Sequence, residues 1–307
     1  MPPRSPLPTR HGLAAAWLRT PDRDPAAAPR WRTFGGWLVE RLPAEVDVAA
    51  MLAEGRFVHA DGSAVLAEEP YRPHTFVWFH RELRAEPEVP GGLTVLHRDD
   101  RVVVVDKPPF LSSIPRGRHV TQSVVVRLRD QLGLPELTPA HRLDRITSGL
   151  LLLTTARRWR GPYQSLFEQR AVGKVYRALA PLRTDLAEPV LVRSHIRKQR
   201  GVLQAEEVPG AAVNAETLVQ LDRVHGAHGE YRLEPRTGRT HQLRLHLCSL
   251  GIPIVGDPLY PTVRDVEVDD FSDPLQLLAA ELSFRDPVDG RPRSFRSERT
   301  LPLPAAG

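Results

Sequence analysis

A run of four consecutive leucines, Leu150–Leu153, constrains the fold of this chain more than any other feature. A short apolar run opened by Thr, Ser and Gly predicts a buried β-strand preceded by a turn. Asp144 would then lie at the rim of the core just before the strand, with Arg142 two residues further back. Such a position suits a catalytic carboxylate, because a stiff scaffold fixes its geometry. The competing interpretation is a surface turn with an ordinary Arg–Asp ion pair.

The composition is that of a globular protein with an excess of positive charge. The chain has 307 residues, a hydrophobic content of 41% and a formal net charge of +5. Only three of its 42 basic residues are lysines, so 39 are arginines, which suit phosphate groups and stacking on bases. The charge favours a polyanionic partner. The alternative is that base composition of the genome put solvated arginines on the surface.

Cysteine usage and the length of apolar runs bear on the cellular compartment. Cys248 is the only cysteine, which excludes an internal disulfide and a zinc site built on several thiolates. No apolar run approaches the roughly 18 residues needed to span a bilayer. We therefore expect a cytoplasmic protein.

The first 90 residues predict a flexible tail and a small module. Residues 1–30 are dense in proline, alanine and arginine without a sustained period, which is typical of a tail. In the module, 31–90, we expect helices at 31–42 and 47–52, a hairpin around Asp61 and Gly62, and a strand at 74–80. A linker is expected at 87–92, which reads PEVPGG.

The remaining residues, 91–307, predict one larger domain rich in strands. Strands are expected at 93–97, 102–107, 150–153, 174–180, 216–221, 230–235 and 275–284, and helices at 121–132, with Thr121 as cap, at 163–170 and within 236–251. Strands outnumber helices and do not alternate regularly with them. We therefore predict an α+β fold with a large mixed sheet.

A second polar stretch, residues 236–251, carries the expected partner of Asp144. If it is helical, His241, Arg244 and Leu245 share one side of the helix. If that side faces the leucine strand, Arg244 is the natural counter-ion, because a buried carboxylate without a partner tends to stay protonated. The competing interpretation places Arg244 and His246 on a solvated helix face.

Taken together, several motifs resemble those of the RluA-type pseudouridine synthases. They read HRLDRITSGLLL at 141–152, KVY at 174–176, TGRTHQLR at 237–244 and GDPLY at 256–260. The resemblance runs from about Leu93 to Phe284 in the family's order, with DKP at 106–108 and NAET at 214–217 in place. It implies the pseudouridine synthase fold, a large, mixed and mostly antiparallel sheet with flanking helices and a central cleft.

The resemblance also implies an activity, the conversion of a uridine in structured RNA to its C5-glycosidic isomer without a metal or an organic cofactor. Asp144 matches the catalytic aspartate, which either attacks the sugar or abstracts a ribose proton. Tyr176 matches the tyrosine that stacks on the uracil and is implicated in removing the C5 proton. Arg244 matches the arginine that pairs with the aspartate. Arg142 matches the arginine that enters the space left by the flipped nucleotide.

Two of these residues, Tyr176 and Arg142, have a structural or simple binding role as the alternative to the one that the resemblance implies. Other residues of the motifs are expected to have structural roles only. Tyr176 has the alternative of a strand residue with a hydrogen-bonded hydroxyl, and Arg142 that of a simple phosphate contact. Lys107 is expected to be solvated at a strand end and His141 to stabilise a turn. Asp257 and Tyr260 are expected to shape the loop beside the site.

Two segments depart from the family's pattern. Residues 277–280 read LLAA, where many relatives carry a histidine. The module at 31–90 resembles the small αL RNA-binding domain of some relatives in its helix–glycine–hairpin order. It lacks the usual basic helix face, so we interpret it as a degenerate copy.

The main competing hypothesis is a catalytically silent RNA-binding protein on the same scaffold. The presence of Asp144, Tyr176 and Arg244 together argues against it. Glycosidases usually need two catalytic carboxylates, and a zinc base deaminase needs more cysteines than this chain has. Ribosomal RNA is the favoured target, transfer RNA is the alternative, and a monomer is expected.

Overall fold

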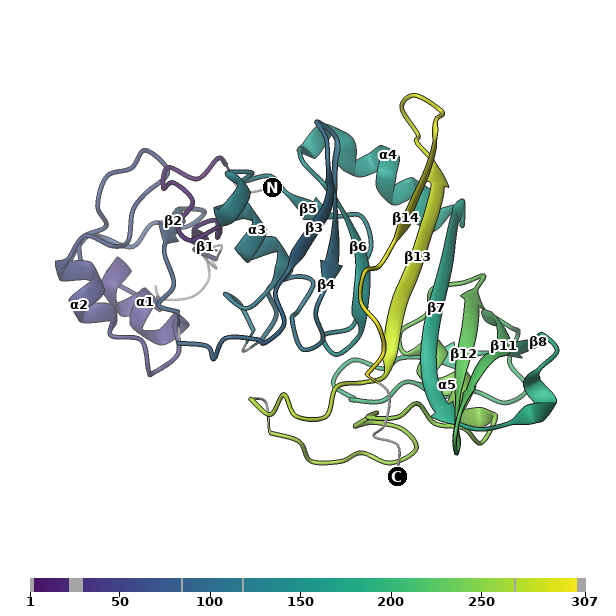
Figure 1. Cartoon of the computed structure of the whole chain (residues 1–307). Helices are drawn as coiled ribbons and strands as arrows, with labels where there is room; N and C mark the ends of the chain where they lie inside the picture. The colour runs from purple at the N-terminus through teal and green to yellow at the C-terminus, as the bar shows by residue number, and fades with distance from the viewer. Residues whose placement is uncertain (1–2, 22–29, 84, 118, 268, 303–307) are drawn as a thin grey trace. The chain divides into compact units, whose positions relative to one another are not determined.

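The computed structural model describes residues 3–21, 30–83, 85–117, 119–267 and 269–302 (Figure 1). The chain divides into two compact units, Met1–Ala85 and Glu86–Gly307. Each unit has a hydrophobic core of its own. None of the helices within the described residues is both long and apolar enough to cross a membrane.

The first unit contains the two helices that the sequence predicts. α1 (Phe34–Arg41) and α2 (Val48–Ala53) are capped by Thr33 and Asp47, whose side chains each accept a hydrogen bond from a first-turn amide. Such caps satisfy amides that the first turn of a helix leaves without a partner. Both helices contribute buried side chains to one core, which they share with Phe57 and with the next strand along the chain.

A strand within the expected tail is the main difference in this unit. β1 (Ala16–Arg19) pairs antiparallel with β2 (Phe76–Phe79), which lies in the predicted strand at 74–80. The tail prediction is therefore wrong for these four residues. Four residues are too few to show a period, and the strand that orders them lies far along the chain. Residues 1–2 and 22–29 of the predicted tail lie outside the described residues.

The segment predicted as a linker is held within the second unit. The Glu86 carboxylate accepts hydrogen bonds of 2.8–2.9 Å from three consecutive backbone amides, those of residues 120–122. Val89 is 4% exposed and belongs to the core of the second unit. The boundary between the units, after Ala85, therefore precedes the segment 87–92.

The second unit is built on one ten-stranded sheet (Figure 1). The strands follow the order β3-β4-β6-β13-β7-β12-β11-β8, with β5 beside β6 and β14 beside β13. Among the strands that the structure describes, β6 and β13 form the one parallel pair of this sheet. The predicted mixed, mostly antiparallel sheet is confirmed.

The ten strands are β3 (Thr94–Arg98), β4 (Val102–Lys107), β5 (Thr138–Pro139), β6 (Ser148–Thr154), β7 (Val172–Pro181), β8 (Val190–Ser194), β11 (Ala215–His225), β12 (His228–Pro235), β13 (Leu277–Arg285) and β14 (Pro292–Arg296). A separate two-stranded ladder pairs β9 (Ile196–Arg197) with β10 (Glu206–Glu207). The helical elements of this unit are α3 (Val124–Leu132), α4 (Arg157–Glu168), η1 (Thr184–Leu186) and α5 (Gln242–Ser249).

Helices α3 and α4 explain why β4 and β6 are continuous apolar runs. Successive side chains of a strand point to opposite faces of its sheet. The odd-numbered valines of β4 and leucines of β6 share a core with α3, whereas the even-numbered ones share a core with side chains of α4. Because a helix covers each face, no position in these runs needs a polar residue.

Three element ends differ from the sequence prediction. α3 begins after Ser123, whose side chain makes no capping hydrogen bond, so the predicted Thr121 cap is wrong. α4 begins at Arg157 and runs through Pro162, although a proline usually marks a helix boundary. The strand predicted at 275–284 is the last that the sequence predicts, whereas β14 follows β13 and pairs with it.

Gly149 fixes where β6 meets β13. Its φ is +104°, and a Cβ at this position would lie 2.3 Å from the carbonyl oxygen of Ala279. Glycine avoids both the clash and the strain of a positive φ. The parallel pairing, with Ala279 opposite Gly149, therefore depends on this glycine. It sets the start of β6 and hence the position of the turn that carries Asp144.

Candidate active site

Asp144 lies in a turn whose backbone is held on both sides. The amide of Thr147 donates to the carbonyl of Asp144 at 3.1 Å. The Ser113 hydroxyl forms hydrogen bonds of 2.8 and 3.1 Å with the carbonyl and the amide of Leu143. On the other side, Lys107 Nζ donates to the carbonyl of Arg145 at 3.0 Å. The Asp144 side chain is 36% exposed, so a fixed backbone presents a carboxylate that a ligand can reach.

The environment of Lys107 differs from the sequence prediction. Instead of being solvated, its side chain is fully buried, and Nζ also donates to the carbonyls of Pro108 and Leu111, each at 2.9 Å. Three carbonyl oxygens match the three protons of an ammonium group. Burial lowers the pKa of Lys107 well below its ordinary value, although the charge of Asp144 acts in the opposite direction. Lys107 therefore ties the end of β4 to the turn that carries Asp144.

Arg244 reaches Asp144 from α5, but its closest partner is another carboxylate. Its Nη1 lies 3.6 Å from Asp144 Oδ2, which confirms the predicted proximity. Its Nε and Nη2 donate to the two oxygens of Asp257 at 2.7 and 2.6 Å. Burial alone would lower the pKa of Arg244, but the Asp257 hydrogen bonds and the charges of Asp257 and Asp144 outweigh it and raise the pKa. One edge of the guanidinium is thus fixed and the other is aimed at Asp144.

Asp257 has a larger part in the site than the predicted loop-shaping one. Its Oδ1 also accepts hydrogen bonds from the backbone amides of Leu259 and Tyr260, at 2.8 and 3.1 Å. The preceding Gly256 has a φ of +75°, and a Cβ there would lie 2.5 Å from the carbonyl of Pro274. The loop therefore delivers a buried carboxylate to Arg244. The sequence signal for this role is the GDPLY motif itself, but its partner lies on α5 and spacing alone does not reveal the pairing.

His241 is a site residue that the sequence prediction placed on the helix side of Arg244 without assigning a role. It precedes α5 in a left-handed conformation with a φ of +59°. Its Nδ1 lies 2.9 Å from the Tyr260 hydroxyl, and its Nε2 lies 3.9 Å from Asp144 Oδ2. Burial lowers the pKa of His241, against the attraction of Asp144. His241, the residue that caps α5, therefore faces the Asp144 carboxylate, as Arg244 does from within the helix.

Tyr260 supports both neighbours of Asp144. Its ring lies under the Arg244 guanidinium, 5.2 Å from the guanidinium carbon to the ring centre. Its hydroxyl accepts from the amide of Ala205 at 2.7 Å and lies 3.0 Å from the Ala205 carbonyl. The phenol is therefore tied to the backbone while its ring and hydroxyl contact Arg244 and His241.

Tyr176 approaches Asp144 from β7. The ring is half-buried and packs against the two cores that meet at this strand, with Ile146 of the Asp144 turn as a neighbour in both. Burial raises the pKa of the Tyr176 phenol, and the charge of Asp144 raises it further. The structure therefore brings Tyr176, Arg244 and Asp144 together.

Arg142 differs from the other predicted site residues in being exposed. It is exposed, and among the described residues no hydrogen bond or ion pair holds its guanidinium. The adjacent His141, by contrast, is fixed. Its Nε2 accepts the amide of Leu152 at 3.2 Å, its ring stacks on Phe167 at 4.4 Å, and burial lowers its pKa to about 3. His141 is therefore a neutral structural residue, whereas Arg142 is free to meet a ligand.

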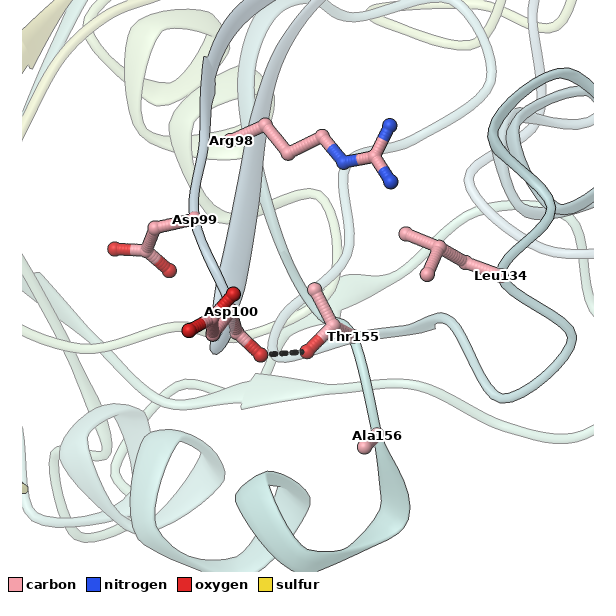
Figure 2. A pocket seen from close by; sticks show the side chains of 6 residues that line it. All are labelled: Arg98, Asp99, Asp100, Leu134, Thr155 and Ala156. Carbon is pink, nitrogen blue, oxygen red and sulfur yellow. Dashed lines mark hydrogen bonds between the residues drawn. The ribbon is translucent and has the colours of Figure 1, made fainter.

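A pocket of about 450 Å³ lies at the other end of β6, away from Asp144. Figure 2 shows its lining, which consists of Arg98 at the end of β3, Asp99 and Asp100 in the turn that follows, and Leu134, Thr155 and Ala156. The Thr155 hydroxyl donates to the carbonyl of Asp100 at 2.6 Å. Asp144 precedes β6 and Thr155 follows it, so the strand's seven residues, about 23 Å at the usual rise, separate the two places. The pocket is not part of the Asp144 site.

Known proteins resemble the chain over the part that carries this site. A family model described as RNA pseudouridylate synthase matches residues 101–249, a span that contains Asp144, Tyr176 and Arg244. An uncharacterized RNA pseudouridine synthase of Synechocystis sp. is 35% identical over 211 residues, which cover 66% of this chain and 70% of that protein. The dual-specificity RNA pseudouridine synthase RluA of Pasteurella multocida is 34% identical over 216 residues, which cover 68% of this chain and 94% of that protein. The chain belongs to the RluA-type RNA pseudouridine synthases.

Solved structures support the same assignment of the fold. The human RNA pseudouridylate synthase domain containing 4 aligns with a TM-score of 0.51 at 26% identity, over 69% of this chain and 88% of that one. The protein is thus an RNA pseudouridine synthase, an isomerase that acts on RNA. The family model begins at residue 101, so it leaves the whole of the first unit unmatched.

Proposed function

We propose that this pseudouridine synthase isomerises one or more specific uridines in structured RNA, with Asp144 as the catalytic carboxylate. The observation that carries the proposal is the arrangement around Asp144. Its backbone is pinned, its carboxylate is open to a ligand, and a buried guanidinium lies 3.6 Å behind it. A fixed and charged group of this kind costs little reorganisation when the reaction begins.

The proposed reaction requires Asp144 in its ionised form. Attack on the sugar and abstraction of a ribose proton both start from that form. The guanidinium of Arg244 places a positive charge 3.6 Å from this carboxylate. Asp257 and Tyr260 hold the guanidinium in place, so the same cation can remain beside Asp144 throughout the reaction.

Tyr176 has two proposed tasks, and its environment bears on each. An aromatic face beside Asp144 suits stacking on the uracil of a flipped nucleotide. Burial keeps the pKa of the phenol above its ordinary value, so the neutral phenol prevails near pH 7. Removal of the C5 proton by this oxygen would therefore have to be coupled to the loss of the phenol's own proton. Stacking and hydrogen bonding need no such step.

Base flipping is proposed because the reacting atoms of a stacked nucleotide are out of reach of a carboxylate. Extrusion leaves a gap in the RNA. Arg142 is exposed, precedes Asp144 by two residues and has no hydrogen-bond or ion-pair partner among the described residues, so it is available to enter that gap. Its guanidinium can stack on the neighbouring bases or bind a phosphate.

We propose ribosomal RNA as the favoured target, with transfer RNA as the alternative, and a cytoplasmic monomer as the working form. The first unit is proposed to contribute to RNA choice as a degenerate αL-type module. A chain that starts at Glu86 tests this last point, because Glu86 and Val89 belong to the second unit. Unchanged RNA affinity in that shortened chain would remove the module from the proposal.

The direct test of target and activity is a map of pseudouridines in total RNA from cells with and without the protein. Loss of a discrete site in the deletion strain, restored by wild type but not by Asp144→Asn, is the expected result. If Asp144→Asn restores the site, Asp144 is not the catalytic carboxylate. If no site is lost and purified protein also leaves transcribed RNAs unmodified, the silent RNA-binding hypothesis is favoured instead.

A further inference from the structure

Lys174 is a partly buried cation for which none of the described residues supplies a partner. It lies on β7, two residues before Tyr176. Its side chain is half-buried, and among the described residues no carboxylate pairs with it and no oxygen accepts a hydrogen bond from its Nζ. Burial lowers the pKa of Lys174, and no neighbouring charge offsets the effect.

The other buried cations of the site show what Lys174 lacks. Lys107 has three carbonyl acceptors, and Arg244 has the two oxygens of Asp257. Taking a cation out of water is unfavourable unless a counter-charge or hydrogen bonds replace the water. Lys174 therefore has the surroundings of a cation whose partner arrives with a ligand.

The position of Lys174 shows which ligand it would meet. β12 pairs with β7 only as far as Leu233 opposite Tyr176, although it continues along β11 to Pro235, and the chain then turns toward α5. In that departing turn, a Cβ on Gly238 would lie 3.9 Å from Lys174 Nζ. On the other side, the charge of Lys174 lowers the pKa of His141, which begins the segment that leads to Asp144. Lys174 thus lies between the Asp144 turn and the turn that precedes Arg244.

We infer that Lys174 binds a backbone phosphate of the RNA close to the target uridine. The inference rests on the proposed function, since it assumes that the RNA enters beside Asp144 and Tyr176. An ammonium group binds phosphate as a compact point charge, and the lack of a side chain on Gly238 leaves room for a strand to approach. The phosphate would also supply the counter-charge that Lys174 lacks among the described residues.

The test compares four full-length proteins on the transcribed RNA segment that carries the mapped uridine. Lys174→Met removes the charge, Lys174→Arg keeps it, and Arg223→Gln removes an exposed charge on β11 whose nearest carboxylate, that of Asp222, is 3.9 Å away. Binding is measured between 50 and 200 mM salt, in an Asp144→Asn background that leaves the RNA unmodified. Turnover of each variant is measured separately with Asp144 intact.

Lys174→Met is expected to weaken binding by about three- to tenfold and to reduce the slope of log K against log salt by about 0.7–0.9, the loss of one phosphate contact. Lys174→Arg should retain most of the affinity, and Arg223→Gln should change neither quantity. The thermal midpoint of Lys174→Met should equal or exceed that of wild type, because an unpartnered cation has been removed. A lower midpoint with unchanged affinity would instead show a structural role.

The failures of this inference and of the proposed function look different. If wild type forms no pseudouridine in any RNA, the proposed function falls and the inference falls with it. If wild type modifies its RNA while Lys174→Met binds that RNA with the same affinity and the same salt dependence, only the phosphate contact is overturned.

Discussion

Replacing Asp257 should harm the protein more than replacing Asp144 does, even though Asp144 is the proposed catalytic residue. Arg244 is 2% exposed, and Asp257 holds it through hydrogen bonds of 2.6 and 2.7 Å. Asp144 lies 3.6 Å from the same guanidinium and is 36% exposed. Replacing Asp257 should therefore mainly lower the stability of the fold, whereas replacing Asp144 should mainly abolish activity.

The magnitudes follow from burial. Removing one partner of a buried, hydrogen-bonded ion pair costs about 3–5 kcal/mol, because it leaves the other charge uncompensated. Asp257→Ala also leaves the backbone amides of Leu259 and Tyr260 without their acceptor, which adds about 1 kcal/mol or more. A partly exposed pair at 3.6 Å contributes only about 0–1 kcal/mol, so Asp144→Asn should change stability by no more than that.

The assay is denaturant unfolding of wild type, Asp257→Ala, Asp257→Asn and Asp144→Asn, followed by turnover for every variant that remains folded. Asp257→Asn keeps an oxygen that can accept one hydrogen bond, so it should lose less stability than Asp257→Ala and should turn over slowly. Asp144→Asn should be stable and inactive. The reasoning is refuted if Asp257→Ala unfolds within about 0.5 kcal/mol of wild type, or if it turns over at the wild-type rate.

Three further predictions concern other parts of the second unit. Gly149→Ala should destabilise the protein by about 2 kcal/mol or more, measured by denaturant unfolding, because a Cβ there meets the Ala279 carbonyl at 2.3 Å and φ is positive; a Gly149→Ala protein as stable as wild type would contradict the contact. Tyr176→Phe should keep the fold and RNA affinity but slow turnover, and a wild-type single-turnover rate would leave the tyrosine as a stacking platform only. Burial lowers the pKa of His246 to about 4 from 6.5, so the unfolded chain takes up this proton first as the pH falls. The stability that His246 contributes is complete above about pH 6.5 and should decline by about 3 kcal/mol toward pH 4. The unfolding free energy of His246→Asn should therefore fall less between pH 7 and pH 5, and an equal fall would assign the pH dependence to other groups.

The sheet could be predicted from the sequence because two of its central strands consist mostly of valine or leucine. The valines of β4 and the leucines of β6 are continuous apolar runs, and only a strand covered on both faces accommodates them. Short elements were harder to predict. β1 has four residues, and its partner β2 lies far along the chain, so the tendency to form a strand is not visible locally. The sequence predicts a helix only from residue 163, whereas α4 begins at Arg157 and runs through Pro162, where packing of Tyr163 and its neighbours on β6 outweighs the missing hydrogen bond.

The site was predictable where residue type and motif order were enough. The proximity of Arg244 to Asp144 follows from a cation on a helix face and a carboxylate before a buried strand. The burial of Lys107 and the pairing of Arg244 with Asp257 were not predictable in the same way. Both depend on where a loop returns: the segment after β4 closes over Lys107, and the loop at Gly256 brings Asp257 under α5. The spacing of residues along the chain does not show that these loops fold back to contact Lys107 and Arg244.

The central claim, that Asp144 of this pseudouridine synthase isomerises uridine in RNA, is tested most directly with purified protein. Total RNA from cells that lack the protein is incubated with wild type or with Asp144→Asn, and pseudouridine is then mapped by selective chemical labelling. Wild type should create pseudouridine at one or a few discrete positions, and Asp144→Asn should create none while binding the same RNA. Pseudouridine formed by Asp144→Asn at the wild-type rate would contradict the claim.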